Sequence, residues 1–168
     1  MQNHTPKRPP VSKQAISIAA RQTAANIINT TSHCNLDLNT LSETIIRHWR
    51  FGMDAYQLAK TLESYSRYRP DMEMLYALEM MNRNVDALYK EQLTSWFNSQ
   101  NITPPFPIGT EVKEGIIDSV DRYGIARYRV KQHDCKEPDL YLLKNFEDVQ
   151  WVSGPSRHYA LEQQRKYG

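Results

Sequence analysis

The segment FGMDAYQLAKTLES, residues 51–64, carries the clearest helix start in the chain. Asp54 and Gln57 have the spacing of a capping box, in which each side chain satisfies a backbone N–H that has no partner inside the first helical turn. Met53 and Leu58 stand where a hydrophobic staple would close the same turn. The segment therefore predicts a helix directly after Asp54, in the middle of the only long periodic region of the chain.

Two more helices are expected on the N-terminal side of this one, which should span 55–65. Residues 12–31 are rich in Ala and Ile, and their apolar side chains recur on one helical face. A second capping box, formed by Thr40 and Glu43, predicts a helix over 40–51. Because so few residues separate this helix from the next, the two must lie at an angle to each other.

The strongest periodicity in the chain follows Pro70. Apolar side chains recur with a spacing of four, three, four and three residues at Met74, Leu78, Met81, Val85 and Leu88. This stripe predicts a helical region from Asp71 to Ser99. Asn84 could cap a separate helix, so the pattern leaves open whether the region holds one helix or two.

A change of pattern follows residues 101–108, where three prolines exclude helix and predict a stiff connection between two domains. Beyond them apolar and polar residues alternate, as they do in strands. The predicted strands are EGIIDSVD (114–121), IARYRVK (125–131), DLYLLK (139–144) and FEDVQWV (146–152). Short strands so closely spaced fit a small closed or half-open barrel.

The run GTEVKEGIIDSVDRYGIARYRV, residues 109–130, followed by EDVQWV, residues 147–152, resembles the strands of Src-homology-3-like small barrels of the Tudor and chromo-barrel kind. The shared features are a Gly before an aliphatic strand and a hairpin with alternating aromatic residues. Barrels of this shape host many unrelated functions, so the resemblance implies a fold and no particular activity.

The chain is therefore expected to be an α+β protein with two domains. Prolines and basic residues predict a flexible basic tail at 1–11. A bundle of four or five helices should follow at 12–100, then a proline-rich linker at 101–108 and a small β-barrel at 109–153. Residues 154–168 should form a C-terminal tail or a short helix.

Composition argues against catalysis. The sequence lacks a G-x-S-x-G motif, an H-E-x-x-H motif and a phosphate-binding glycine loop, and its five histidines are scattered singly. Cys34 and Cys135 lie far apart without the close ligand pairs of a zinc site. We expect a non-catalytic protein that uses no metal and no cofactor.

The charge balance is nearly even, with 21 Lys and Arg against 19 Asp and Glu, so a net charge of +2 gives only mild attraction to nucleic acid. The basic N-terminus is not followed by an apolar run, which argues against a signal peptide. No segment approaches the length of a membrane span. A cytoplasmic protein that does not contact membranes is the expectation.

Nucleic-acid binding is the favoured function, as an accessory or regulatory protein, and one candidate surface is a helix-turn-helix. If residues 55–65 form its first helix, its second helix begins near Asp71. Arginines contact phosphates and tyrosines stack on bases, and the intervening loop offers both. The residues concerned are Tyr65, Arg67, Tyr68 and Arg69. The loop is long for this motif and the following helix is acidic and apolar, so a helical bundle with a basic loop is the alternative.

A second candidate surface is the outward side of the strand at 125–131, where Arg127, Arg129 and Lys131 could follow a phosphate backbone beside Tyr123 or Tyr141. Two other interpretations stay open. Basic residues on an exposed strand also prevent edge-to-edge aggregation. In addition, Asp118 and Asp121 on the facing strand would neutralise part of the positive field.

The main alternative function is that of a protein-binding adaptor or inhibitor, acting through the barrel or the helical face. Methionine-rich faces adapt to varied partners, and near-heptad spacing could pair two copies of the chain, which would then be a homodimer rather than a monomer. The candidate partner-binding residues are Met74, Met81, Tyr123 and Tyr141. The same methionine stripe could instead be the core of its own bundle.

Overall fold

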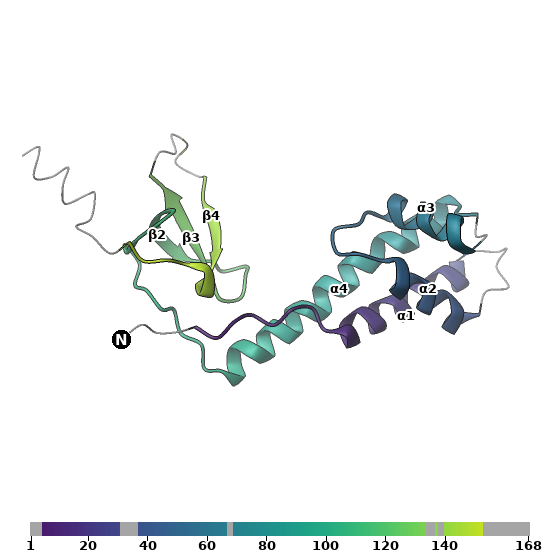
Figure 1. Ribbon diagram of the computed structural model, residues 1–168, viewed down its shortest axis with the longest axis horizontal. Helices are drawn as coiled ribbons and strands as arrows, with labels where there is room; N and C mark the ends of the chain where they lie inside the picture. Colours follow the sequence, from purple (N-terminus) through teal and green to yellow (C-terminus); the bar gives the residue numbers. More distant parts are fainter. Residues whose placement is uncertain (1–4, 31–36, 67–68, 134–136, 138–139, 153–168) are drawn as a thin grey trace, which may run out of the picture. The chain divides into compact units, whose positions relative to one another are not determined.

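The structure is a computed structural model that describes residues 5–30, 37–66, 69–133, 137 and 140–152. Within these ranges the chain forms four α-helices and a four-stranded antiparallel sheet (Figure 1), which confirms the predicted α+β class. The helices are α1 (Lys13–Thr30), α2 (Leu38–His48), α3 (Ala55–Ser66) and α4 (Met72–Ser99). The strands are β1 (Glu111–Val112), β2 (Gly115–Val120), β3 (Arg127–Gln132) and β4 (Leu142–Asn145), followed by a 3₁₀ turn, η1 (Phe146–Asp148). The predicted tail at 154–168 lies outside the described residues.

The chain divides into two compact units, which we call the helical unit and the sheet unit. The helical unit is Pro9–Leu93, and the sheet unit is Met1–Arg8 with Thr94–Gly168. The boundary falls inside α4, ahead of the proline-rich segment at 101–108 where the sequence placed a linker. It does so because Trp96 and Phe97, near the end of α4, pack against the core of the sheet unit.

The core of the helical unit is built by one face of each helix. The predicted stripe on α4 points inward: Met74, Leu78, Met81 and Val85 are each at most 2% exposed, and α4 is one continuous helix. On α1, Ala residues allow close approach, and Ile27 is fully buried. No helix in the described part of the chain is long and apolar enough to span a membrane.

Of the two capping boxes predicted in this unit, one forms and one does not. The box at Asp54 is confirmed, since the Gln57 N–H donates to Asp54 Oδ1 at 2.7 Å and the Asp54 N–H donates to Gln57 Oε1 at 3.3 Å. The box predicted at Thr40 is wrong. Asp37 caps α2 instead, accepting from both the N–H and the hydroxyl of Thr40 at 2.8 and 2.9 Å, and these bonds lower the pKa of Asp37. A carboxylate three residues upstream therefore starts α2 before Thr40.

Asn82 explains how the connection between α2 and α3 is held against α4. Its side-chain oxygen accepts from Trp49 Nε1 at 3.0 Å, and its amide donates to the Met53 carbonyl at 2.8 Å. Trp49 is 6% exposed. An asparagine that sequence propensity marks as an interruption of α4 thus satisfies two partly buried polar groups.

The helix-turn-helix prediction is not supported. α3 and α4 follow one another, but α4 buries its apolar stripe in the core of the unit, and its exposed first turns carry Met72, Glu73 and Tyr76. A recognition helix needs an exposed polar or basic face at its N-terminal end to approach the DNA backbone and base edges.

The sheet has the linear order β1-β2-β3-β4, with every neighbouring pair antiparallel. The alternation predicted over 125–131 is confirmed: Ala126, just before β3, and Tyr128 and Val130 within it are at most 4% exposed. Tyr128 donates to the Phe106 carbonyl at 2.7 Å and accepts from the Phe106 N–H at 2.9 Å, which fastens the proline-rich segment to the sheet core. Burial raises the pKa of Tyr128, an effect that its hydrogen bond to Phe106 partly offsets.

Closure of the sheet into the barrel implied by the resemblance is not supported. In the described residues the sheet is open. β1 contacts the segment after η1 through a bridge between Val112 and Trp151 and a bond from the Lys113 N–H to the Gln150 carbonyl at 3.0 Å. The strand predicted at 146–152 is wrong, since residues 146–148 form η1 and only Trp151 takes part in an isolated bridge. The 3₁₀ turn buries Phe146 against Tyr128 in place of a ladder.

Candidate nucleic-acid interface

The three basic residues predicted on the outward side of β3 have different surroundings. Arg127 forms an ion pair within the sheet unit. Its Nη2 donates to Asp121 Oδ2 at 2.8 Å, and the Asp121 side chain is only 5% exposed. The guanidinium also lies against Gly124, where a Cβ would overlap it. Arg127 is therefore a structural residue, because a nearly buried carboxylate neutralises its charge.

Arg129 is placed differently, although it lies on the same side of the same strand. Its guanidinium stacks over the ring of Tyr141, 4.0 Å from the centroid, and neither side chain is fully exposed. Arg129 forms no ion pair with any residue that the structure describes. Stacking on an aromatic ring fixes the guanidinium while its N–H edges stay able to bind an oxyanion.

Lys131 follows on the same side of β3 and is exposed, in register with Ile116 of β2. Residues two apart on a strand lie on one side, about 6.6 Å from each other. We call Arg129, Lys131 and Tyr141 the β3 face. It is the part of the predicted strand surface that keeps its positive charge available.

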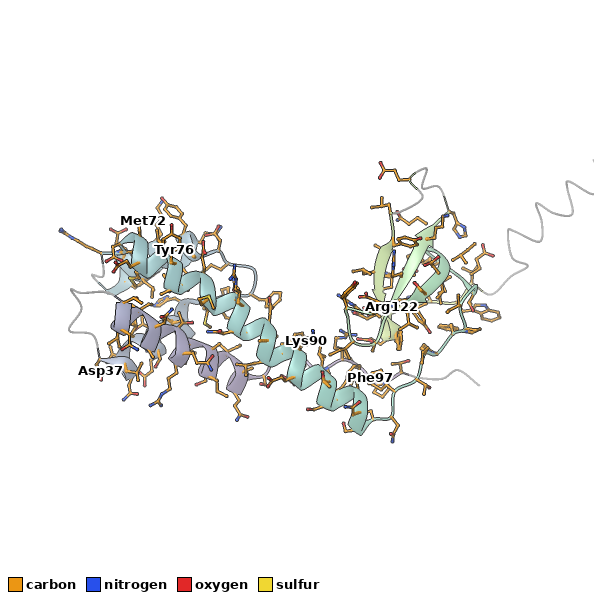
Figure 2. The ribbon with its side chains drawn as sticks, turned by 180° about the vertical axis from the view of Figure 1, so that it is seen from behind. Asp37, Met72, Tyr76, Lys90, Phe97 and Arg122 are labelled. Atoms are coloured by element: carbon orange, nitrogen blue, oxygen red, sulfur yellow. The ribbon has the colours of Figure 1, made fainter. Side chains whose placement is uncertain are left out.

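Tyr123 does not join the β3 face. It lies in the turn after β2, at the Arg127 end of β3, where its backbone N–H donates to Asp121 Oδ1 at 3.1 Å and its side chain is 89% exposed. Arg122 beside it is also exposed (Figure 2). The turn thus offers a second, separate pairing of an aromatic and a basic side chain.

Other charges of the sheet unit are partly compensated. Lys144 Nζ lies 2.7 Å from Glu114 Oε1, and His133 Nε2 lies 3.5 Å from Glu111 Oε1. The pair of Lys144 and Glu114 limits the positive field, as the sequence suggested for Asp121.

The structure describes two of the four candidate nucleic-acid-binding residues of the helical unit. Tyr65 is 73% exposed and stacks on His48, with ring centroids 4.6 Å apart. Arg69 is exposed, whereas Arg67 and Tyr68 lie outside the described residues. Of the four candidates in this region, the structure therefore places only Tyr65 and Arg69.

The partner-binding residues predicted on α4 are not on a surface. Met74 and Met81 are 2% and 1% exposed, and the Thr23 hydroxyl contacts the sulfur of Met81 at 3.7 Å. They belong to the core of the helical unit, which is the other interpretation that the stripe allowed.

A shallow apolar groove of about 290 Å³ lies in the sheet unit. Its walls come from the end of α4, the proline-rich segment, the turn between β2 and β3, and η1. The lining residues are Thr94, Phe97, Pro104, Val120, Asp121, Gly124, Ile125, Ala126 and Phe146. Nearly all of the lining is apolar, so the groove suits an apolar group better than a charged one.

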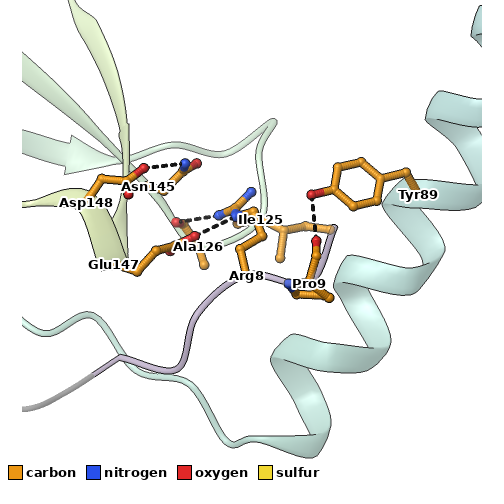
Figure 3. A network of polar contacts seen from close by, with 8 residues as sticks. All are labelled: Arg8, Pro9, Tyr89, Ile125, Ala126, Asn145, Glu147 and Asp148. Atoms are coloured by element: carbon orange, nitrogen blue, oxygen red, sulfur yellow. Dashed lines mark hydrogen bonds and ion pairs between the residues drawn. The ribbon is translucent and has the colours of Figure 1, made fainter. Parts of the chain in front are cut away.

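Sequence reasoning missed Arg8, which lies in the segment interpreted as a flexible tail. Arg8 Nε donates to Glu147 Oε1 at 2.9 Å, and its Nη2 donates to the carbonyls of Ile125 and Ala126 at 2.8 and 3.0 Å (Figure 3). Its guanidinium also lies 5.7 Å from the ring centroid of Trp96. The next residues attach to the helical unit, where the Tyr89 hydroxyl donates to the Pro9 carbonyl at 3.0 Å.

Comparison of the chain with protein-family models, with curated proteins and with solved structures found no match. Among the described residues no group of three or more His, Cys, Asp or Glu side chains is arranged to hold a metal ion. The basis for a functional proposal is therefore the chemistry of the surfaces themselves.

Proposed function

We propose that this chain is a non-catalytic, cytoplasmic accessory or regulatory protein that binds nucleic acid through the β3 face. The stacked pair of Arg129 and Tyr141, with Lys131 beside it, is the observation that carries the proposal. A guanidinium held over an aromatic ring presents its donors to a phosphate with little further loss of side-chain freedom.

Net charge does not single out the β3 face, since residues 94–152 contain seven Lys and Arg against nine Asp and Glu. Residues 9–93 contain nine Lys and Arg and nine Asp and Glu, so the surplus of two positive charges lies outside both ranges. Attraction to phosphates is the sequence-independent part of nucleic-acid binding. A small surplus predicts weak, strongly salt-dependent binding.

Charge reversal on the β3 face tests the proposal. Arg129→Glu together with Lys131→Glu should weaken binding to mixed-sequence DNA or RNA by roughly tenfold or more at low salt. It should also lower the slope of log K against log salt by about 1 for each phosphate that the variant no longer binds. The control is Arg21→Glu, which makes the same charge change as either single variant at an exposed site on α1.

A conservative variant separates stacking from charge. Arg129→Lys keeps the positive charge but removes the planar group over Tyr141, so it should bind more weakly than the wild type and more tightly than Arg129→Glu. The proposal fails if the wild-type chain binds neither duplex nor single-stranded nucleic acid at low salt. It also fails if Arg21→Glu weakens binding as much as Arg129→Glu.

The apolar groove favours a second function, that of a protein-binding adaptor or inhibitor. Val120 lies on the groove wall and is 38% exposed, so Val120→Asp places a charge there without burying it in the core. A partner held by the groove should stay bound after nuclease treatment and after reversal of the β3 face. It should be released by Val120→Asp, whereas nucleic-acid binding should show the opposite pattern.

A further inference from the structure

The outer face of α4 carries a second repeat, opposite the stripe that is buried in the helical unit. Its residues are spaced four, three, four, three and four apart, and all are exposed. They are Met72, Tyr76, Glu79, Arg83, Asp86 and Lys90. Met72, Tyr76 and Lys90 follow one another along the helix (Figure 2). We call this set the outer stripe.

The outer stripe begins with two large apolar side chains that the unit leaves in solvent. Met72 and Tyr76 are 60% and 62% exposed, and Met80 beside them is 36% exposed. A solvated helix face is normally polar throughout. Adjacent exposed apolar side chains on a helix are a common feature of surfaces that bind another protein.

The charges of the stripe are complementary to the same stripe running in the opposite direction. When two copies of α4 pack antiparallel about a two-fold axis level with Met81, residues whose numbers sum to 162 face each other. Glu79 then faces Arg83 of the second copy, and Arg83 faces Glu79 of that copy. The same register sets Tyr76 opposite Asp86, so that its hydroxyl can donate to the carboxylate, and Met72 opposite the aliphatic part of Lys90.

Other registers are less complementary. In a parallel pair each residue lies beside its own copy, so Glu79 would face Glu79 and Arg83 would face Arg83, which is repulsive. An antiparallel pair shifted by one heptad toward the C-terminus sets Glu79 opposite Lys90 but leaves Met72 and Tyr76 uncovered. The opposite shift sets Glu79 opposite Tyr76 and Arg83 opposite Met72, so it pairs no opposite charges within the stripe. Only the register about Met81 satisfies both the charges and the apolar side chains.

Glu79 and Arg83 are available for such contacts. They stand four residues apart on one helix, yet neither forms an ion pair with any residue in the described ranges. We propose that the outer stripe binds a second copy of the chain, with two α4 helices packed antiparallel about Met81. This homodimer contact is independent of the β3 face.

Sedimentation of the 168-residue chain over a range of concentrations tests the proposal. The wild type should show a concentration-dependent dimer. Glu79→Arg and Arg83→Glu should each weaken the dimer about ten- to a hundredfold, because each substitution turns two symmetry-related attractions into repulsions. The double variant Glu79→Arg/Arg83→Glu should restore the dimer.

Mixing the two single variants gives the decisive result. One chain then carries Arg at both positions and the other carries Glu at both, so the antiparallel pair is complementary in the mixture and repulsive in each protein alone. The mixture should form a heterodimer while each variant by itself is monomeric. An ion pair within one helix could not produce this outcome.

Tyr76→Ala, with Tyr56→Ala as its matched control, tests the apolar part. Tyr56 is 60% exposed on α3 and lies off the stripe. Tyr76→Ala should weaken the dimer several-fold, and Tyr56→Ala should leave it unchanged. A wild-type chain that stays monomeric at every concentration overturns the proposal. So does a dimer that persists unchanged in Glu79→Arg.

Discussion

Replacing Arg8 with Ala tests whether the N-terminal segment is part of the sheet unit or a tail. The Arg8 side chain is 16% exposed and its partner Glu147 is 11% exposed, so the pair is shielded from solvent. Arg8→Ala removes one charge-assisted bond to Glu147, two bonds to backbone carbonyls and the packing of the guanidinium near Trp96.

The expected cost is about 2–4 kcal/mol of the free energy of unfolding of the sheet unit. A hydrogen bond to a charged group contributes about 1.5–3 kcal/mol. Removing one partner of a nearly buried pair adds the penalty of leaving Glu147 without its counter-charge. Glu147 Oε2 is already buried without a hydrogen-bond partner among the described residues, so that carboxylate depends on Arg8. Lys7→Ala is the matched control, since Lys7 is exposed, and it should change stability by less than about 0.5 kcal/mol.

Amide hydrogen exchange of β2 and β3 is the suitable assay, because a chain of two units need not unfold in one step. Exchange in these strands should speed up in Arg8→Ala and not in Lys7→Ala. A double-mutant cycle with Glu147→Ala should give a coupling energy of about 1–3 kcal/mol. Equal exchange in Arg8→Ala and Lys7→Ala, with no coupling to Glu147, would contradict this prediction and favour a flexible tail.

Three further predictions concern the two cores. Asn82→Ala should lower the free energy of unfolding of the helical unit by about 1–3 kcal/mol, because the buried indole N–H of Trp49 loses its acceptor. Urea unfolding followed by tryptophan fluorescence measures the change. Gly115→Ala should disrupt the pairing of β2 with β3, because its Cβ would overlap a backbone oxygen of β3, and exchange of the β3 amides should speed up. Burial raises the pKa of Tyr128, so the folded state keeps the phenol proton to higher pH than the unfolded state, and stability should fall as pH rises above about 10. In Tyr128→Phe the loss of stability above about pH 10 should be smaller. Stability at neutral pH should drop by about 1–3 kcal/mol, because the backbone N–H and carbonyl of Phe106 lose their partner. Urea unfolding at several pH values measures both effects.

Features governed by near neighbours in the chain could be predicted from the sequence. The capping box at Asp54, the inward stripe of α4 and the alternation along β3 all depend on residues within a few positions of one another. The predicted start of α2 is misplaced because the residue that caps it, Asp37, lies three positions ahead of the predicted box at Thr40. Asp37 prevailed because its carboxylate accepts two bonds from Thr40.

Features governed by distant partners could not be predicted. Arg8 and Glu147 are 139 positions apart, and nothing in either neighbourhood indicates the other. The same holds for the boundary inside α4, which depends on Trp96 packing against the sheet core. Closure of the barrel depends on how the residues after η1 pair with β1, and these residues are distant in the sequence. In the described residues they form a single bridge, at Val112.

The contrast between Arg127 and Arg129 shows why composition does not tell which basic residues keep their charge available. Both arginines lie on the outward side of β3, and the sequence pattern does not distinguish them. Their roles diverge because Asp121 at the turn neutralises the first, whereas Tyr141 supports the second without neutralising it. A carboxylate neighbour fixes an arginine by cancelling its charge, but an aromatic neighbour fixes it and leaves the charge to act on a ligand. Under our proposal, a stacked aromatic neighbour such as Tyr141 is therefore a better marker of a phosphate-binding arginine than the number of basic residues on a strand.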